Sequence, residues 1–117
     1  MSFLKNFGYA LAGIGHAIKT QRNMKVHLVA TILVVTVGLF LRISKQEWVD
    51  ICFAIFLVLA AECINTAIEA VVNLTSPQKH PLAKIAKDCA AGAVLLLALN
   101  SVVVAYLILW PKLSYCF

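Results

Sequence analysis

Four polar residues recur at helical spacing in a stretch that is otherwise apolar enough to lie in lipid. The stretch is AAECINTAIEAVVNLTSP, residues 60–77, and the polar residues are Glu62, Asn65, Glu69 and Asn73. Steps of three, four and four residues place them on one face of a helix. Ionisable groups inside a membrane span are costly, so they usually face the protein interior and have a task. We call these four residues the polar stripe.

The two carboxylates of the polar stripe suggest a division of roles. Glu62 and Glu69 are about 10 Å apart along the helix axis, which suits one group that binds a cation and another that takes a proton. The alternative is a structural role, in which the stripe hydrogen-bonds to neighbouring helices. Asparagine alone would serve that purpose at less cost than two carboxylates, so the pattern favours chemistry.

A second polar cluster follows in the segment PQKHPLAKIAKDCA. It places Lys84, Lys87 and Asp88 on the first turns of an expected helix. Lys84 and Asp88 are four residues apart, so a simple ion pair is one interpretation. A helical hairpin would also return the cluster to one end of the polar stripe, where lysines beside carboxylates suit a phosphate chain and its metal ion. The sequence contains no GxxxxGK[ST], HExxH or Ser-His-Asp pattern, which excludes a P-loop.

The composition requires a membrane or a partner around these residues. The chain has 117 residues, of which 62% are hydrophobic and 13% charged, with a net charge of +5. A single small domain cannot bury that much apolar surface in water. Basic residues beside apolar spans are typical of cytoplasmic flanks, and nothing in the sequence indicates a nucleic-acid partner.

The hydrophobic pattern predicts an all-α membrane protein with one domain over residues 1–117. We expect an amphipathic surface helix over about 2–22, followed by spans over about 24–42, 48–74 and 82–110. Ser44 and Glu47 have the spacing of a capping box at the start of the second span. Pro111 is expected to end the third span.

The distribution of basic residues predicts the orientation of the spans. Residues 1–27 and 75–88 carry an excess of lysine and arginine, whereas residues 42–50 are balanced by acids. The positive-inside bias therefore places the N-terminus and both polar clusters on the cytoplasmic side. The isolated histidines His16 and His27 have no ligand spacing and are expected to be polar residues at the membrane interface.

Two motifs carry a family resemblance. AECINTAIEAVVN, followed by HPLAKIAKDCAAGAVL, closely resembles the prokaryotic diacylglycerol kinase family, whose pattern is E-x-x-N-[ST]-A-I-E-x-x-V-D and then A-K-D. The likeness covers nearly the whole chain and is stronger to the undecaprenol kinase branch. It implies a homotrimer in the bacterial inner membrane, with active sites shared between subunits. It also implies transfer of the γ-phosphate of MgATP to the hydroxyl of undecaprenol or diacylglycerol.

The resemblance assigns roles to matching residues. Glu62 would be the general base that takes the hydroxyl proton, and Asn65 would orient the groups around it. Glu69 would bind Mg²⁺, Lys87 the phosphates of ATP, and Asp88 the adenosine side. The remaining implied contacts are Tyr9, Gln78, Lys79 and His80 with the nucleotide, and Ala91, together with Glu62, with the lipid substrate.

The chain departs from the family pattern at two positions. Gln21 stands where the pattern has Glu as the second metal ligand, and Asn73 stands where it has Asp. An amide oxygen still binds Mg²⁺ but without negative charge, so metal affinity is expected to fall. The sequence therefore leaves open a weakened kinase or a non-enzymatic trimeric scaffold of the same fold. A third alternative is a small transporter subunit whose carboxylates carry protons, although a proton path needs no lysine cluster.

Overall fold

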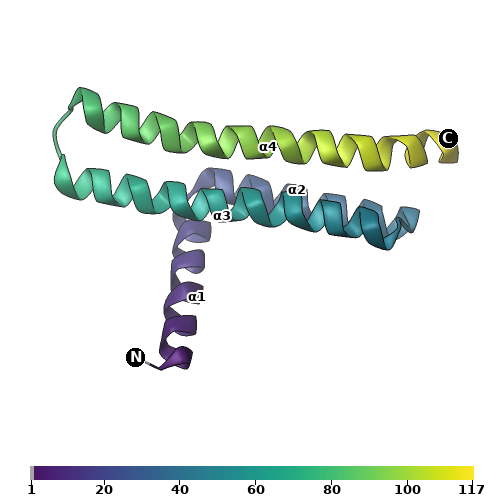
Figure 1. The fold of residues 1–117 in the computed structure, drawn as a ribbon, viewed down its shortest axis with the longest axis horizontal. Coiled ribbons are helices and arrows are strands. Elements are labelled where there is room, and N and C mark those ends of the chain that lie inside the picture. Colours follow the sequence, from purple (N-terminus) through teal and green to yellow (C-terminus); the bar gives the residue numbers. More distant parts are fainter. Residues whose placement is uncertain (1) are drawn as a thin grey trace.

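The computed structural model describes residues 2–117, and these residues form four helices joined by short connections. The helices are α1 (Phe3–Thr20), α2 (Arg22–Leu41), α3 (Lys45–Thr75) and α4 (Pro81–Cys116). Figure 1 shows α2, α3 and α4 lying side by side while α1 projects away from them. The prediction of an all-α chain is confirmed.

The three long helices are each able to cross a membrane. They contain 20, 31 and 36 residues and carry long apolar stretches. Because a helix rises about 1.5 Å per residue, about 20 residues cross the hydrocarbon core. Large hydrophobic side chains on their outer faces are exposed, for example Phe53, Phe56 and Leu96. Such a surface requires lipid or another protein chain, so the protein is a multi-span membrane protein.

The helix hairpin of α3 and α4 is the frame on which the other helices rest. These two helices run antiparallel along most of their length, and α2 packs against both. Ser101 Oγ donates a hydrogen bond to the Ala54 carbonyl across the hairpin at 3.1 Å. A small core of Ile43, Ile51 and Leu109 closes the end of the bundle opposite the α3–α4 turn.

The connection between α2 and α3 is fixed by local chemistry. Ser44 Oγ accepts from the Glu47 amide at 3.2 Å, and Glu47 Oε1 accepts from the Ser44 amide at 2.8 Å. This reciprocal pair is the predicted capping box. Arg42 adopts the left-handed conformation, with φ of 53°, and closes α2. Gly38 is needed nearby, because a Cβ there would lie 2.8 Å from the Trp48 ring.

The prediction that Pro111 ends the last helix is wrong. Helix α4 continues through Pro111 to Cys116. A proline removes one backbone hydrogen bond and kinks a helix, but an apolar helix in a membrane has no better alternative for its backbone groups. Ser114 Oγ donates to the Pro111 carbonyl at 3.0 Å. Lys112 also pairs with Glu47 at 3.3 Å, which ties the last turns to the start of α3.

Helix α1 contacts the bundle through its last turns. Ala17 is its only fully buried residue, whereas Phe3, Phe7 and Tyr9 near its beginning are more than half exposed. The rings of Phe3 and Phe7 stack with centroids 6.5 Å apart. Gln21 separates α1 from α2 in extended conformation, which lets the chain turn between the two helices.

Candidate active site

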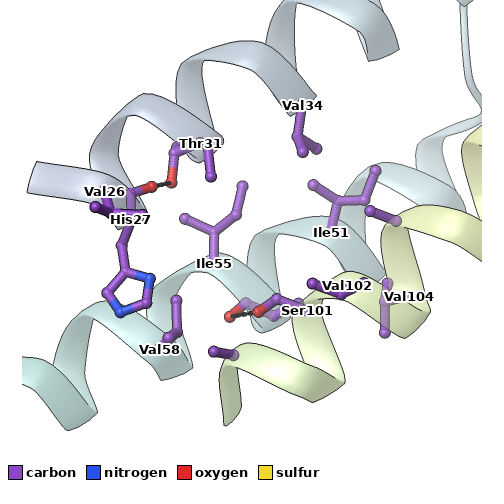
Figure 2. Close-up of a pocket in the computed structure, with 14 residues that line it drawn as sticks. Val26, His27, Thr31, Val34, Ile51, Ile55, Val58, Ser101, Val102 and Val104 are labelled. Carbon is purple, nitrogen blue, oxygen red and sulfur yellow. Dashed lines mark hydrogen bonds between the residues drawn. The ribbon is translucent and has the colours of Figure 1, made fainter. Parts of the chain in front are cut away.

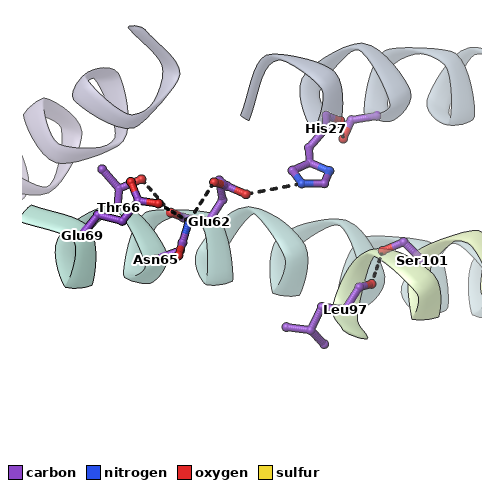
Figure 3. A network of polar contacts seen from close by, with 8 residues as sticks. His27, Glu62, Asn65, Thr66, Glu69, Leu97 and Ser101 are labelled. Atoms are coloured by element: carbon purple, nitrogen blue, oxygen red, sulfur yellow. Dashed lines mark hydrogen bonds and ion pairs between the residues drawn. The ribbon is translucent and has the colours of Figure 1, made fainter. Parts of the chain in front are cut away.

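Three residues of the polar stripe, Glu62, Asn65 and Glu69, form a connected network on α3. Asn65 Nδ2 donates to Glu62 Oε1 at 3.4 Å and to Glu69 Oε1 at 3.5 Å, as Figure 3 shows. The Thr66 hydroxyl donates to the Glu62 carbonyl at 2.8 Å. Glu62 is 0% exposed. One amide therefore bridges the two carboxylates, and the more buried of them is the predicted base.

The connection between α1 and α2 brings Gln21 to the same network. Gln21 Nε2 donates to Glu69 Oε2 at 3.3 Å. The two residues that the resemblance assigns to the metal are therefore neighbours, although 48 positions separate them in the chain. A turn of the Gln21 amide about its last bond would present Oε1 in place of Nε2.

The side-chain oxygens of Glu69 and Gln21 are of the type that Mg²⁺ prefers, but they are few. Carboxylate and amide oxygens are the ligands that this ion prefers, and it commonly keeps several waters and binds substrate phosphates. The buried Asn65 Oδ1 atom has no hydrogen-bond partner within residues 2–117. The same residues contain no group of three or more His, Cys, Asp or Glu side chains able to hold a metal. Glu69 and Gln21 would therefore hold the ion only together with water and nucleotide phosphate.

His27, which the sequence predicts to be a polar residue at the membrane interface, has its side chain turned toward Glu62 inside the helix bundle. Its side chain is 15% exposed, and its Nε2 atom lies 3.5 Å from Glu62 Oε2 (Figure 3). The sequence does contain a signal for this position. His27 is an ionisable residue that begins the apolar run HLVATILVV, and such residues usually face the protein interior.

The second polar cluster surrounds a hollow at the α3–α4 turn. The hollow has a volume of about 570 Å³. Its polar lining consists of Asn73, Ser76, Gln78, Lys79, His80, Lys84, Lys87 and Asp88. Lys87 Nζ donates to Asn73 Oδ1 at 2.6 Å. The hairpin therefore brings the lysines to the end of the polar stripe, and the sequence did not reveal that Asn73 is the contact.

Two members of this cluster also have local structural roles. Lys84 pairs with Asp88 at 2.6 Å, and both side chains are mostly exposed. Such a pair contributes little to stability. His80 Nδ1 accepts from the Leu82 amide at 3.1 Å and caps α4, with Pro81 at the first helical position. The simple pairing of Lys84 with Asp88 is thus present, and both side chains still line the hollow.

Two predicted site residues are exposed and do not line the hollow. Tyr9 is 62% exposed, and within residues 2–117 its helix α1 makes no packing contact with α4. Ala91 lies exposed on α4. Neither residue is part of the lining of the hollow.

The protein is a membrane protein with three long apolar helices. It has a candidate polar site, which consists of the carboxylate network around the buried Glu62 and the lysine-lined hollow. Residues 8–109 match the sequence model described as prokaryotic diacylglycerol kinase. The chain therefore belongs to this family and is a membrane lipid kinase, which is a phosphotransferase.

Relatives that carry two different names, diacylglycerol kinase and undecaprenol kinase, are similar to this chain. A diacylglycerol kinase of Synechocystis sp. is 43% identical over 96% of this chain and 65% of its own length, so this chain spans just under two thirds of that relative. An undecaprenol kinase of Bacillus subtilis is 41% identical over 95% of this chain and 90% of its own length. A diacylglycerol kinase of Escherichia coli K12 is 30% identical over 92% of this chain and 88% of its own length.

Proposed function

We propose that this chain transfers the γ-phosphate of MgATP to the hydroxyl of a membrane lipid, undecaprenol or diacylglycerol. The observation that carries the proposal is the network in which Asn65 bridges Glu62 and Glu69 inside the helix bundle. Phosphoryl transfer needs positioned charges more than covalent chemistry. A buried base, a metal-binding carboxylate and nearby lysines are the groups that this reaction requires.

Glu62 acts as the general base in this mechanism. Its carboxylate takes the proton of the lipid hydroxyl while the hydroxyl oxygen forms its bond to the γ-phosphorus. The bond from that phosphorus to the β,γ-bridging oxygen breaks, and ADP leaves. Asn65 restrains the carboxylate through its hydrogen bond to Oε1. Burial of Glu62 excludes water, which would otherwise compete with the lipid as acceptor.

Glu69 and Gln21 are the residues that would hold Mg²⁺. The ion, when bound, neutralises charge on the transferring phosphoryl group. Glu69 supplies the protein's negative charge to the ion, and Gln21 supplies a neutral oxygen. With this donor set, most of the remaining ligands come from water and the nucleotide.

The hollow at the α3–α4 turn is the proposed ATP site. Lys87 contacts the phosphates, Asp88 the adenosine side, and Gln78, Lys79 and His80 line the opening. Lys87 reaches the polar stripe through Asn73, which lies one turn, about 6 Å, beyond Glu69. That short separation supports a shared site for nucleotide and metal.

The exposure of Tyr9 and Ala91 favours a site completed by neighbouring subunits. We propose a homotrimer in which α1 of one chain approaches the hollow of another, so that Tyr9 contacts ATP and Ala91 contacts the lipid. In this arrangement α1 is an amphipathic helix on the cytoplasmic surface of the bacterial inner membrane. The exposed apolar side chains of α1, such as Phe3 and Leu11, support that placement.

The test is a transfer assay on purified protein in mixed micelles, with radiolabelled ATP and a panel that includes undecaprenol and diacylglycerol. We expect label in at least one lipid, lost in Glu62→Gln while assembly and nucleotide binding persist. Near-normal turnover by Glu62→Gln would remove this residue from the mechanism. The panel also decides between the two substrates, whose names occur among relatives of nearly equal identity.

A weakened enzyme or a trimeric scaffold is the second candidate. The contact between Gln21 Nε2 and Glu69 Oε2 favours it, because this hydrogen bond occupies the carboxylate that would hold Mg²⁺. A weakened enzyme would label lipid only slowly and at raised Mg²⁺ concentration. A scaffold would label no lipid in the panel at any Mg²⁺ concentration, while the protein still assembles.

A further inference from the structure

His27 lies between the carboxylate of Glu62 and a partly open cavity lined by residues of α2, α3 and α4. The cavity has a volume of about 260 Å³, and apart from His27, Thr31 and Ser101 its lining is aliphatic (Figure 2). On the other side of the imidazole, Nε2 lies 3.5 Å from Glu62 Oε2. The ring therefore has apolar surroundings on one side and a carboxylate on the other.

The two facing atoms each lack another partner. Within residues 2–117, His27 Nε2 and Glu62 Oε2 are buried without a hydrogen bond. A buried polar atom without a partner destabilises the folded protein. A small approach, from 3.5 Å to about 2.9 Å, would satisfy both atoms at once. Nε2 must then carry the hydrogen, because an ionised carboxylate only accepts.

We propose that His27 is a positioning residue for Glu62, donating from Nε2 to Oε2. Asn65 Nδ2 already donates to the other oxygen, Oε1, at 3.4 Å. The two donors come from different helices, α2 and α3. Together they fix the plane of the carboxylate relative to both helices and leave lone pairs on each oxygen free to accept a proton. The inference rests on the proposed function, in which Glu62 accepts the hydroxyl proton.

Two variants of His27 test this role by distinguishing the effect of its N–H donor from the effect of the rest of its side chain. His27→Gln keeps an N–H donor at nearly the reach of Nε2, whereas His27→Asn is polar but too short to contact Glu62. We expect His27→Asn to lower kcat roughly 10- to 100-fold, the size of effect that follows a misplacement of about 1 Å. The KM for ATP should stay constant, and His27→Gln should recover most of the activity.

The matched control is His16→Asn, since His16 is an exposed histidine on α1. It should leave kcat unchanged. Trimer mass and thermal unfolding are measured for all three variants, so that loss of folding is separated from loss of rate. Wild-type kcat in His27→Asn, or equal losses in His27→Asn and His27→Gln, would overturn the proposal.

A spectroscopic measurement tests the contact without any enzyme assay. In protein with ¹⁵N-labelled histidine, Glu62→Gln should shift the Nε2 resonance of His27 and leave that of His16 in place. An unmoved His27 signal contradicts the contact. If the wild-type protein phosphorylates no lipid, the proposed function fails, and this resonance still decides whether His27 and Glu62 interact.

Discussion

Replacing Gln21 by glutamate is the sharpest test of the metal site. In the structure the Gln21 amide donates to Glu69 at 3.3 Å. Gln21→Glu would exchange that donor for a second carboxylate. Two full negative charges at 3.3 Å repel by about 5 kcal/mol at an effective dielectric constant of about 20. The side chains will move apart or take up a proton to relieve part of this repulsion.

A divalent cation relieves the same repulsion by binding both carboxylates. If only about 1.4 kcal/mol of the repulsion is recovered on binding, Mg²⁺ affinity rises about tenfold. We therefore expect the Mg²⁺ concentration for half-maximal lipid phosphorylation to fall by roughly that factor. The variant should also be less stable than wild type without Mg²⁺ and gain more stability when Mg²⁺ is added.

The assay combines a Mg²⁺ titration of kinase activity with thermal unfolding at the same Mg²⁺ concentrations. Gln46→Glu is the matched control. Gln46 makes the same type of amide contact, to Asp50 at 3.2 Å, but on an exposed surface near the start of α3. Unchanged Mg²⁺ dependence in Gln21→Glu, or an equal change in Gln46→Glu, would refute the placement of the metal beside Glu69.

Three further variants address other parts of the chain. Glu69→Ala should raise the Mg²⁺ requirement of the transfer reaction steeply; an unchanged titration would mean that the metal is held elsewhere. Lys87→Met should raise the KM for ATP roughly tenfold or more, because a hydrogen bond to a charged group contributes about 1.5–3 kcal/mol. An unaltered KM would show that Lys87 does not bind the phosphates. Gly38→Ala should lower the free energy of unfolding by about 1–3 kcal/mol through overpacking against the Trp48 ring, and a denaturation midpoint equal to that of wild type would show that the ring moves aside.

The parts of the fold that depend on neighbouring residues in the chain could be predicted from the sequence. The three-residue spacing of Ser44 and Glu47 predicts a capping box, and the capping box is present. The polar stripe follows from helical periodicity, which is why the carboxylates of Glu62 and Glu69 both lie within hydrogen-bond distance of the Asn65 amide. Pro111 was the failure among these local rules. The loss of a single backbone hydrogen bond does not end a 36-residue apolar helix, because in a membrane no water is available to bind its backbone groups.

The sequence predicts which ends of the helices lie together, but it does not predict which residues of different helices make contact. The hairpin rule places the lysines beside the end of the polar stripe, but the pairing of Lys87 with Asn73 depends on the register of α3 against α4. The position of His27 depends in the same way on how α2 lies against α3. A lone histidine carries no spacing that periodicity can use, so the burial of an ionisable residue was its only available signal.

The two departures from the family pattern have a common physical consequence. Gln21 and Asn73 each stand where the pattern has a carboxylate, and each makes a hydrogen bond to a residue of the proposed site. Gln21 contacts Glu69 at 3.3 Å, and Asn73 contacts Lys87 at 2.6 Å. A carboxylate at the first position would strengthen metal binding, whereas a carboxylate at the second would neutralise part of the charge of Lys87. In the proposed mechanism, the lack of both carboxylates would therefore weaken the attraction for Mg²⁺ but leave the full charge of Lys87 for the phosphates of the nucleotide. If the proposed site is correct, Mg²⁺ binding in this chain would depend less on the protein's own ligands and more on the nucleotide that carries the metal in.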